Sequence, residues 1–271
     1  MKESIAGKII LITGSTDGLG KLVARHLLEK GATILFHGRN EEKGEKVFDE
    51  LKEITRKENI KYYNADLSSL NEVKALSNKI LKERDRLDVL INNAGIGRGS
   101  SNKRELSKDG IELRFAVNYL SHVLLTEKLL GIIPPQTGRI INVSSIGQEP
   151  INFNDLMLEK HYDGYYAYKQ SKAAQIMYTI DLADRLKDKG IKVNAVHPSS
   201  LMNTRMVLDE WGYSLTTVEQ GAEAVENLLN VDTTGAYYDT IRLSKAIPEV
   251  YDPQNRERLA QATKILLKQF L

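Results

Sequence analysis

The chain lacks cysteine altogether, which excludes disulfide bonds and thiolate chemistry. No apolar run reaches the ~18 residues expected of a membrane-spanning helix, so we expect no membrane span. The 5 histidines are scattered along the 271 residues without the spacing of metal ligands, and we expect no metal site. The sequence also contains no internal repeat and no Pro/Gly/Ser-rich linker.

The chain has little excess charge of either sign. Its formal net charge is +2, and its 38 basic and 36 acidic residues are dispersed along the sequence, so it lacks the electrostatic footprint of a nucleic-acid-binding protein. Glycines at positions 14 to 20 interrupt the only early apolar run, and we expect no secretory signal. With no disulfide framework, signal or span, we expect a cytoplasmic protein.

Short apolar runs alternate with segments that carry apolar residues at helical spacing. This alternation predicts an α/β fold, with one doubly wound Rossmann-type domain over residues 1–271 and a parallel sheet flanked by helices on both faces. Length alone allows one or two domains, and the absence of a linker favours one. The predicted strands cover residues 8–12, 33–40, 60–63, 88–91, 138–145 and 191–198.

A glycine-rich turn follows the first predicted strand and precedes a helical segment. Free backbone N–H groups and the positive end of the helix dipole make such a turn a cradle for a phosphate. Gly14, Gly18 and Gly20 do not have the spacing of the usual dinucleotide fingerprint, and Ser15 and Leu22 exclude a Walker A loop. On this motif alone, a tight turn that binds no ligand stays open as an alternative.

A tyrosine and a lysine four residues apart, Tyr168 and Lys172, lie on one face of a predicted helix. A nearby ammonium favours the phenolate and lowers the tyrosine pKa from ~10. The pair is therefore suited to proton transfer with an alcohol. Chance pairs of this kind are common on solvated helix surfaces, and Tyr165 and Lys169 form a second, overlapping pair.

Five motifs occur together in the order found in the short-chain dehydrogenase/reductase family. They are Thr13-Gly14-x-x-x-Gly18-x-Gly20, Asn92-Asn93-Ala94-Gly95, Asn118, Asn142-Val143-Ser144-Ser145 and Tyr168-x-x-x-Lys172. The chain resembles that family from about Lys8 to about Pro198, and the five motifs in register are far more specific than any one of them. A long connection between the serine and tyrosine motifs makes it similar to the retinol-dehydrogenase-like and carbonyl-reductase-like branches.

The resemblance implies hydride transfer between a nicotinamide cofactor and a carbonyl or alcohol carbon of a small-molecule substrate. It makes Tyr168 the acid or base and Ser145 the group that orients the substrate oxygen. Lys172 is implied to tune the phenol and to bind the nicotinamide ribose. Asn118 is implied to complete the proton relay.

Two of these assignments depend on family register. Only Tyr168 is followed by the family's Ser-Lys pair and small residues, which favours it over Tyr165. Ser145 matches the serine that acts on the substrate oxygen. Ser144 is one residue off and would face the opposite side of the strand.

The second predicted strand ends in Gly38 and Arg39, with no carboxylate before Glu41. Sites for NAD place an acidic residue here for the ribose 2′-hydroxyl, whereas an arginine suits the 2′-phosphate of NADP. By resemblance, Arg39 binds that phosphate and the cofactor is NADP(H) rather than NAD(H); the alternative is that Arg39 only caps a surface turn. The full set of implied cofactor-binding residues is Gly14, Ser15, Asp17, Gly18, Leu19, Gly20, Arg39, Asp66, Leu67, Asn93, Ala94, Gly95, Tyr168, Lys172 and Pro198.

Two segments on the expected substrate side depart from the compact members of the family. An insertion at 148–164 and a lid at 199–217 are rich in apolar residues, which favours a fairly apolar substrate pocket, although such residues also build ordinary cores. Ser199 stands where the family usually has glycine after Pro198, so the backbone there is less free. The resemblance implies a homodimer or homotetramer, or a monomer as in relatives with long insertions.

A different class of function stays open. Some proteins of this fold bind NADP(H) as regulatory or redox-sensing modules and turn over nothing. The intact Ser145, Tyr168 and Lys172 favour an enzyme, because a pure binding module has no need of a proton relay. A nucleotide-sugar epimerase is a third interpretation, and the chain length and the spacing of the glycines disfavour it.

Overall fold

The computed structural model describes residues 4–55, 57–99 and 102–271. Its strands form one eight-stranded sheet in the order β3-β2-β1-β4-β5-β6-β7-β8, in which all neighbours are parallel except β7 and β8. The strands are β1 (Ile9–Ile12), β2 (Thr33–Gly38), β3 (Ile60–Asn64), β4 (Val89–Asn92), β5 (Arg139–Val143), β6 (Lys192–His197), β7 (Ala236–Asp239) and β8 (Arg242–Ser244). This is the strand order of a doubly wound dinucleotide-binding fold, extended at one edge.

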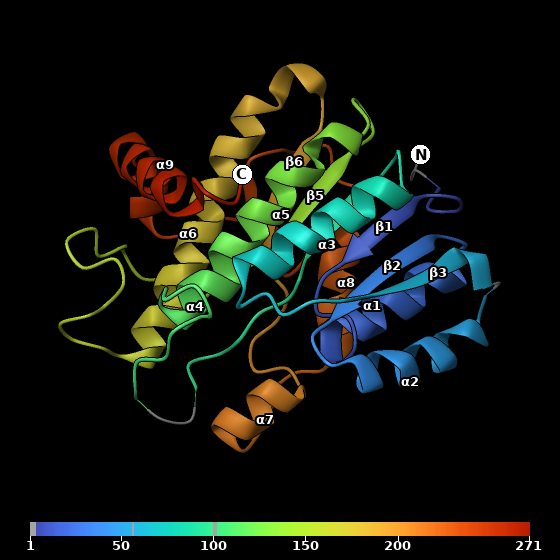
Figure 1. Cartoon of the computed structure of the whole chain (residues 1–271), viewed down its shortest axis with the longest axis horizontal. Helices are drawn as coiled ribbons and strands as arrows, with labels where there is room; N and C mark the ends of the chain where they lie inside the picture. Colours follow the sequence, from blue (N-terminus) through green and yellow to red (C-terminus); the bar gives the residue numbers. More distant parts are fainter. Residues whose placement is uncertain (1–3, 56, 100–101) are drawn as a thin grey trace.

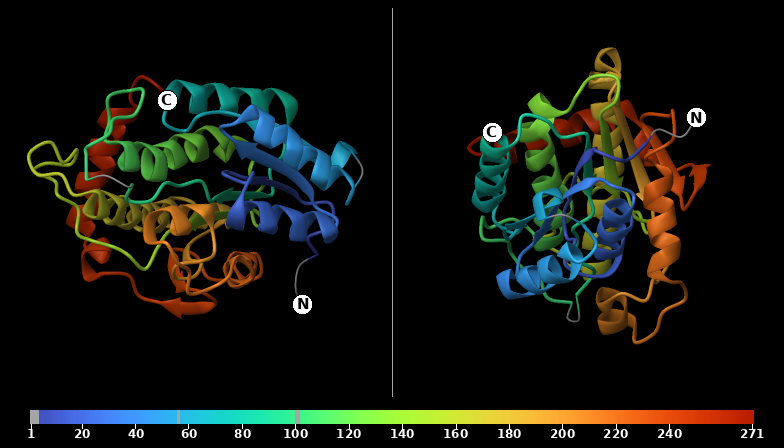
Figure 2. Two further views of the ribbon diagram at one scale, coloured as in Figure 1. Left: turned by 90° about the horizontal axis from the view of Figure 1, so that it is seen from below. Right: turned by 90° about the vertical axis from the view of Figure 1, so that its right-hand side faces the viewer.

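Helices cover both faces of this sheet (Figures 1 and 2). The α-helices of the described residues are α1 (Gly18–Glu29), α2 (Glu41–Lys52), α3 (Leu70–Glu83), α4 (Leu113–Phe115), α5 (Ser121–Leu129), α6 (Gly164–Arg185), α7 (Arg205–Trp211), α8 (Val218–Asn227) and α9 (Pro253–Leu267). A π-helical turn, η2 (Ala116–Leu120), joins α4 to α5. Short 3-10 turns are η1 (Lys57–Asn59), η3 (Leu130–Ile132), η4 (Lys187–Lys189) and η5 (Pro248–Tyr251).

Alternate side chains of each strand face opposite layers of helices. Ile10 pairs in register with Ile34, and both belong to the core beneath α1, α2 and α8. Leu11 and Leu35 point the other way, into the core beneath α3, α5, α6 and α9. Because both faces are covered, the central strands β1, β2 and β4 are nearly continuous apolar runs, as buried parallel strands usually are.

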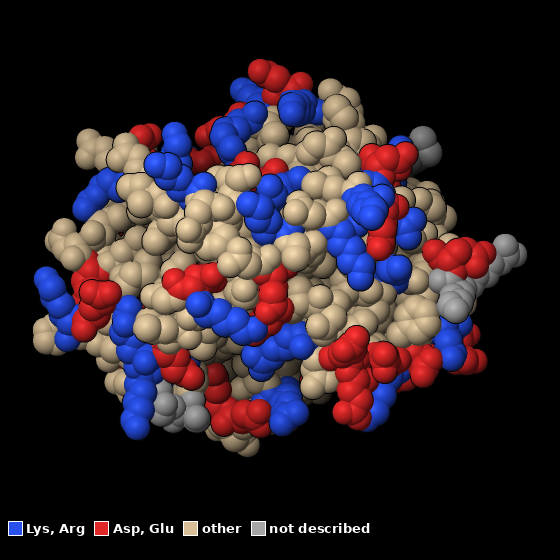
Figure 3. All heavy atoms as spheres, in the orientation of Figure 1, with Lys and Arg blue, Asp and Glu red and all other residues tan. Residues whose placement is uncertain are grey.

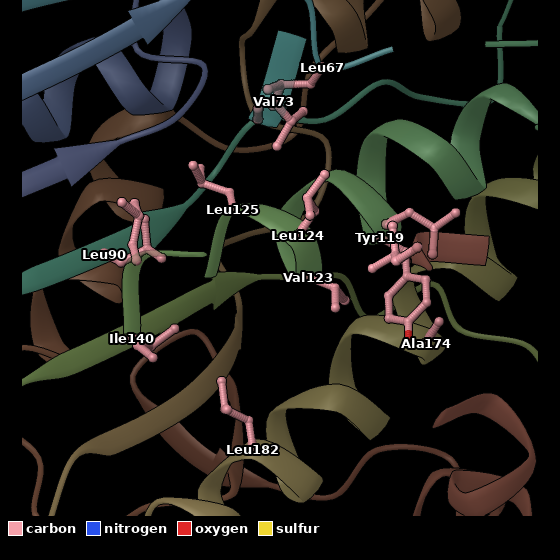
Figure 4. Packing of buried hydrophobic residues seen from close by; sticks show 14 of the residues in the cluster. Leu67, Val73, Leu90, Tyr119, Val123, Leu124, Leu125, Ile140, Ala174 and Leu182 are labelled. Carbon is pink, nitrogen blue, oxygen red and sulfur yellow. The ribbon is translucent and has the colours of Figure 1, made fainter. Parts of the chain in front are cut away.

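The larger core fixes the helices that carry the candidate site (Figure 4). Leu90 and Ile140 of the sheet, Leu124 of α5 and Leu182 of α6 are fully buried in it. Truncation of one such leucine to alanine costs about 2–5 kcal/mol in comparable cores. The packing therefore holds α5 and α6, and with them the motifs at 118 and 168–172, firmly against the sheet.

Short polar residues fix where the helices begin. Asp17, Asn40, Ser69 and Asp163 each accept a hydrogen bond from a backbone N–H in the first turn of α1, α2, α3 and α6. These bonds satisfy N–H groups that have no partner inside the helix. The cap at Asp17 sets the N-terminus of α1 directly after the glycine-rich turn.

The structure confirms the α/β fold class, and the six predicted strands are present with ends shifted by one or two residues. Sequence reasoning did not predict β7, β8 or the helices that follow residue 204, and the lid contains a helix, α7, at the lower edge of Figure 1. Among the described residues, no helix is long and apolar enough to cross a bilayer. On the face seen in Figure 3, basic and acidic side chains are interspersed.

Candidate active site

The carboxyl ends of β1, β4, β5 and β6 meet at one edge of the sheet, and the predicted motifs follow these ends. β1 lies between β2 and β4, and the chain reverses its direction of winding there. In open parallel sheets, ligands bind outside the carboxyl ends of the strands at such a reversal. The topology therefore brings the glycine turn and the serine motif to the same side of the molecule.

Close packing accounts for two of the turn's glycines. A Cβ on Gly20 would lie 2.5 Å from both Asn93 Nδ2 and the Gly14 carbonyl oxygen. A Cβ on Gly14, whose φ is +63°, would lie 2.7 Å from the Cα atom of Ala94. Gly18 also has a positive φ, +47°, and faces the lid instead. The glycines thus let the turn and the helix start lie directly against the motif after β4.

The motif after β4 holds this turn by hydrogen bonds. Thr13 Oγ1 accepts from the backbone N–H groups of Asn93 and Ala94, each at 3.0 Å. Asn93 Nδ2 donates to the carbonyl oxygens of Thr13 at 2.8 Å and Gly14 at 3.0 Å. Asn92 points inward and donates to Asn142. Both asparagines have structural partners, and Asn93 and Ala94 line the site through the turn that they support.

A buried histidine, which sequence reasoning missed, ties the turn to the next strand. His37 Nδ1 accepts from the Gly14 N–H at 3.2 Å, and its Nε2 lies 3.0 Å from the Ala65 carbonyl oxygen. Burial lowers the pKa of His37 to about 4, so the ring is neutral. Ser15 donates its hydroxyl to Ile12 and accepts from the His37 N–H. Its side chain is therefore fully occupied within the protein, as a support of the turn.

The rim of this cradle carries free and paired charges. Arg39 is exposed after β2 and has no hydrogen-bond or ion-pair partner among the described residues. A Cβ at Gly38 would lie 2.5 Å from Thr16 Cγ2, so a larger residue at this position would require the Thr16 side chain to move. Asp17 is neutralised by an ion pair with Lys43. Of Arg39, Asp17 and Lys43, only Arg39 has no charged partner within the described part of the chain.

The other predicted cofactor contacts lie along the same edge. Asp66 accepts from the Ser68 N–H at 3.0 Å and pairs with Lys108 at 3.2 Å. Burial alone would raise the pKa of Asp66, but these partners hold it below its usual value. The carboxylate is therefore charged at neutral pH. Leu67 and Leu19 are buried and offer a ligand mainly their backbone.

The serine motif at the end of β5 sends its two hydroxyls to different places. Ser144 donates to the Lys172 carbonyl oxygen at 2.9 Å, which fastens α6 to the strand. Ser145 Oγ accepts from the Gly147 N–H at 3.0 Å. A Cβ on Gly147 would lie 3.4 Å from Ser145 Oγ and 3.8 Å from Tyr168 Cε1. Ser145 and Tyr168 therefore border the same small space.

The half-buried Tyr168 phenol has a raised pKa. Burial is the main cause, and the negative charge of Glu210 adds to it, while a hydrogen bond from Ser145 opposes it. The expected lowering of this pKa by Lys172 is wrong for this structure. Lys172 Nζ lies 5.8 Å from the centre of the Tyr168 ring, and burial outweighs the effects that lower the pKa of the phenol.

Lys172 is only 5% exposed, and burial lowers its pKa to about 7. Its Nζ donates to the Val143 carbonyl oxygen at 2.9 Å and to Gln175 Oε1 at 3.1 Å. A Cβ on Gly95 would lie 3.7 Å from Nζ, so the glycine after β4 leaves room for the ammonium. Near neutral pH this lysine can both hold and release a proton.

Asn118 lies in the π-helical turn between α4 and α5, where it is fully buried. Its Oδ1 accepts from the Ile96 N–H at 2.9 Å, and its Nδ2 donates to the Ile96 carbonyl oxygen and to Ser171 Oγ. A π turn inserts one residue into a helix and is frequent at functional sites. The amide links the loop after β4 to α6, next to Lys172.

The second tyrosine–lysine pair faces outward. Tyr165 is 39% exposed and packs edge-on against Trp211 of the lid, with ring centres 6.2 Å apart. Lys169 lies over the Tyr165 ring and pairs with Glu149 at 3.1 Å. The structure thus places Tyr168 beside the serine motif and Tyr165 under the lid.

The lid is fastened over the loop after β4. Glu210 Oε1 accepts from the Gly99 N–H at 2.9 Å, and a Cβ on Gly97 would lie 2.2 Å from the same oxygen. Arg98 donates to the Glu210 carbonyl oxygen at 2.8 Å and lies 4.4 Å from the Trp211 ring centre. Sequence reasoning predicted a lid at 199–217 but not this contact, which brings the charge of Glu210 close to the Tyr168 phenol.

One residue near the start of the lid has a left-handed backbone conformation. Ser199 does not have a positive φ, and the chain turns instead at Leu201, whose φ is +47°. Pro198 is buried at the end of β6. Thr204 caps α7 and would lie 3.2 Å from a Cβ on Gly18. The left-handed position of this loop is therefore Leu201 rather than Ser199, and Thr204 brings the base of the lid to the glycine turn.

The substrate side is bordered by the insertion and by strands that sequence reasoning missed. Gln170 anchors the insertion by accepting from the Asn152 N–H and donating to the Leu156 carbonyl oxygen. Tyr237 of β7 donates to the Ser145 carbonyl oxygen at 3.2 Å. A hollow of about 230 Å³ lies beside this contact. Its lining residues are Ile146, Gln148, Tyr237, Asp239, Ser244, Lys245, Ala246 and Ile247.

Within the described part of the chain, no group of three or more His, Cys, Asp or Glu side chains could hold a metal ion. The site is instead built from a phenol, a hydroxyl, an ammonium and an amide beside a glycine-rich helix N-terminus. That set is suited to binding a phosphorylated cofactor and to moving a proton.

Comparisons with known proteins agree with this arrangement. Residues 8–211 match the short chain dehydrogenase family. Retinol dehydrogenase 13 of Mus musculus is 32% identical over 95% of this chain and 83% of its own length. Retinol dehydrogenase 14 of Homo sapiens is 31% identical over 96% of this chain and 86% of its own length.

Solved structures share the fold over most of the chain. An uncharacterized protein from Mycobacterium Paratuberculosis superposes with a TM-score of 0.80 at 26% identity, covering 98% of this chain and 96% of its own. The Pseudomonas aeruginosa RhlG/NADP active-site complex gives a TM-score of 0.71 at 24% identity, covering 88% and 97%. The chain therefore belongs to the short-chain dehydrogenase family, and it is an NAD(P)-dependent oxidoreductase that interconverts alcohols and carbonyls.

Proposed function

We propose that this chain is an NADP(H)-dependent oxidoreductase for fairly apolar small molecules, with Tyr168 as the acid and base. The observation that carries the proposal is the meeting of three groups at the end of β5. Ser145 and Tyr168 border one space, and Lys172 lies beneath them on the next turn of α6. We further propose that residues 1–271 form one domain.

In this proposal Tyr168 exchanges a proton with the substrate oxygen. Its raised pKa keeps the phenol protonated at neutral pH, so it is ready to donate during carbonyl reduction. Ser145 donates a second hydrogen bond to the same oxygen and stabilises the charge that develops there. Lys172, with a pKa of about 7, can return the proton to the site, and Asn118 holds the adjoining loop and helix in place.

The residues of the cradle fit a dinucleotide phosphate. The start of α1 directs backbone N–H groups at the space that Gly14, Gly18 and Gly20 leave open. When bound, the nicotinamide cofactor donates or accepts the hydride. Arg39 supports NADP(H) over NAD(H), because its guanidinium is exposed and unpaired among the described residues and matches a dianionic phosphate.

Apolar side chains at the rim support an apolar substrate. Ile146 is 57% exposed next to the serine motif, and Met206, Leu208 and Tyr213 are exposed on or beside α7. Exposed apolar groups gathered near a site commonly contact a ligand. The relatives are named for retinol, an apolar alcohol, which agrees with this substrate class.

A non-catalytic NADP(H)-binding sensor of the same fold is the alternative. Such a protein has no use for a phenol and a lysine buried together, because burying an ammonium that binds nothing costs stability. Occupancy of the proton-transfer positions by Ser145, Tyr168 and Lys172 therefore favours the enzyme. The sensor also makes a distinct experimental prediction, tight binding of NADPH without turnover.

The test is the loss of NADPH absorbance with decanal, benzaldehyde, cyclohexanone, all-trans-retinal and menadione, each compared with NADH. We expect turnover of at least one apolar carbonyl, with NADPH preferred. Tyr168→Phe should abolish that turnover, while Tyr165→Phe, a matched control three residues away, should keep it. Binding of NADPH with no turnover of any compound would support the sensor, and activity that survives Tyr168→Phe would refute the assigned acid.

A further inference from the structure

A chain of buried polar groups extends from Lys172 away from the substrate side. Lys172 Nζ donates to Gln175 Oε1 at 3.1 Å, and Gln175 Nε2 lies 2.7 Å from His122 Nδ1 on α5. All three side chains are 5% exposed or less. Neither Gln175 nor His122 belongs to the five sequence motifs, and the proton transfer described above does not use them.

The donors and acceptors fix the orientation of this chain. An ammonium only donates, so the amide oxygen of Gln175 must face Lys172 and its NH₂ group must face His122. His122 Nδ1 then accepts, and the ring proton lies on Nε2. Burial lowers the pKa of His122 to about 3, and the charge of Lys172 also lowers it, so the imidazole stays neutral. If Nδ1 of His122 carried the proton instead, the Gln175 amide would have to rotate, and its NH₂ group would then face the Lys172 ammonium.

The ammonium has few other sources of stabilisation. Groups that can titrate face it from three elements: Tyr168 on its own helix, His122 on α5 and His197 on β6, whose pKa Lys172 helps to lower. No carboxylate forms an ion pair with Lys172 within the described chain, and burial is the cause of its lowered pKa. The Val143 carbonyl and the Gln175 amide oxygen are its hydrogen-bond acceptors.

We propose that Gln175 is a positioning residue that keeps Lys172 protonated and turned toward β5, and that His122 locks the amide in the orientation this requires. The inference rests on the proposed function, because it assigns a task to the partner of a proposed active-site lysine. It gives the two buried side chains a role in the charge of the site. A neutral acceptor stabilises an ammonium without placing a negative charge beside the Tyr168 phenol.

The test is the titration of Lys172 in the cofactor-free protein. Lysine side chains are labelled with ¹³C and ¹⁵N, their resonances are followed by NMR as a function of pH, and Lys172→Met identifies the signal. Gln175→Leu should lower the midpoint by about one unit, a tenfold change in the ratio of ammonium to amine. Gln175→Glu should raise it, because a carboxylate favours the charged form. A midpoint that neither change moves overturns the proposal, as does a shift of the same sign in both.

The role of His122 is tested by two substitutions at that position. His122→Leu removes the acceptor for the amide NH₂ and should lower the Lys172 midpoint in the direction of Gln175→Leu. His122→Asn can present a side-chain oxygen to the same NH₂ and should restore most of the wild-type value. If Lys172 titrated with the same midpoint in both His122 variants, the proposal that His122 holds the Gln175 amide in its orientation would be contradicted.

Gln170→Leu is the matched control, since Gln170 is a buried glutamine on the same helix whose partners are backbone groups of the insertion. Its loss should leave the Lys172 midpoint unchanged. The titration needs no substrate, so its failure is separate from failure of the proposed function. If Tyr168→Phe is inactive and Gln175→Leu titrates like wild type, only this inference is wrong.

Discussion

Replacement of Lys172 by methionine should change how the stability of the protein depends on pH, and it should remove the proposed activity. The reason is the cost of burying an ammonium. Its pKa falls from 10.5 to about 7 because burial disfavours the charged form. A basic group whose pKa is lower in the folded protein than in the unfolded chain destabilises the folded state at any pH where the unfolded chain holds the proton. Methionine fills a similar volume and carries no charge.

The magnitude follows from the pKa difference. Each unit corresponds to ~1.4 kcal/mol, so at pH 6, where lysine is protonated in both states, the difference between 10.5 and about 7 costs the fold about 5 kcal/mol. Methionine removes this cost but leaves two acceptors, the Val143 carbonyl and the Gln175 amide oxygen, without their donor. An unpaired buried group costs about 1–3 kcal/mol. The two acceptors together therefore cost about 2–6 kcal/mol, so the net change at pH 6 lies between a loss of about 1 kcal/mol and a gain of about 3 kcal/mol.

The pH dependence gives the sharper signature. Between pH 7 and pH 10.5 the unfolded chain holds more protons on Lys172 than the folded protein, so this group makes wild-type stability rise with pH. Relative to wild type, Lys172→Met should therefore become less stable by ~1.4 kcal/mol per pH unit through this window, and above it only the loss of the hydrogen bonds remains.

Urea unfolding of both proteins at pH 6, 8 and 9.5 measures this difference in the free energy of unfolding. Lys169→Met is the matched control, because Lys169 lies on the same helix but pairs with Glu149 near the surface, and its stability difference from wild type should not change with pH in this way. A Lys172→Met protein that is less stable than wild type by the same amount at every pH would refute the reasoning.

Three other predictions follow from the site. Arg39→Ala should weaken NADPH binding by about 1.5–3 kcal/mol and leave NADH binding nearly unchanged, as measured by fluorescence titration; equal losses would contradict the 2′-phosphate assignment. Tyr168→Phe should lower turnover by at least ~10²-fold, whereas Tyr165→Phe should retain most of it, and reversed results would shift the catalytic register by one turn. Glu210→Gln removes a negative charge that raises the Tyr168 pKa, so the alkaline fall of carbonyl reduction should move to lower pH; a pH–rate profile that does not move would show that the lid carboxylate has no influence on the phenol.

Much of the fold was predictable because its signals are local. Within the predicted strands, residues 10–12 and 34–38 are buried on both faces, and such short apolar runs predict a strand without knowledge of the segments that pack on them. The preference for Tyr168 over Tyr165 came from family register, because only Tyr168 is followed by the family's Ser-Lys pair and small residues. The structure agrees in placing Tyr168 beside Ser145 and Tyr165 under Trp211.

The parts that were missed depend on contacts between distant segments. His37 stands alone in an apolar strand, and only the fold shows that Gly14 and Ala65 flank it. Gln175 reads as an ordinary helix residue until α5 brings His122 against it. A polar residue inside an otherwise apolar stretch is the signal that was present, because a buried polar group needs a partner. The sequence therefore indicates which polar residue needs a hydrogen-bond partner, but it does not indicate which residue that partner is.

The direction of the Tyr168 pKa was missed for the same reason, and it bears on how the site works. Spacing on a helix suggested that an ammonium would favour the phenolate, but burial favours the neutral form of both groups, raising the pKa of Tyr168 and lowering that of Lys172. At neutral pH the proton therefore rests on the phenol. Carbonyl reduction needs a proton there, whereas alcohol oxidation needs the phenolate that burial and the charge of Glu210 oppose. If Tyr168 is the acid and base, as proposed, the pH–rate profile of alcohol oxidation should therefore require a higher pH than that of carbonyl reduction.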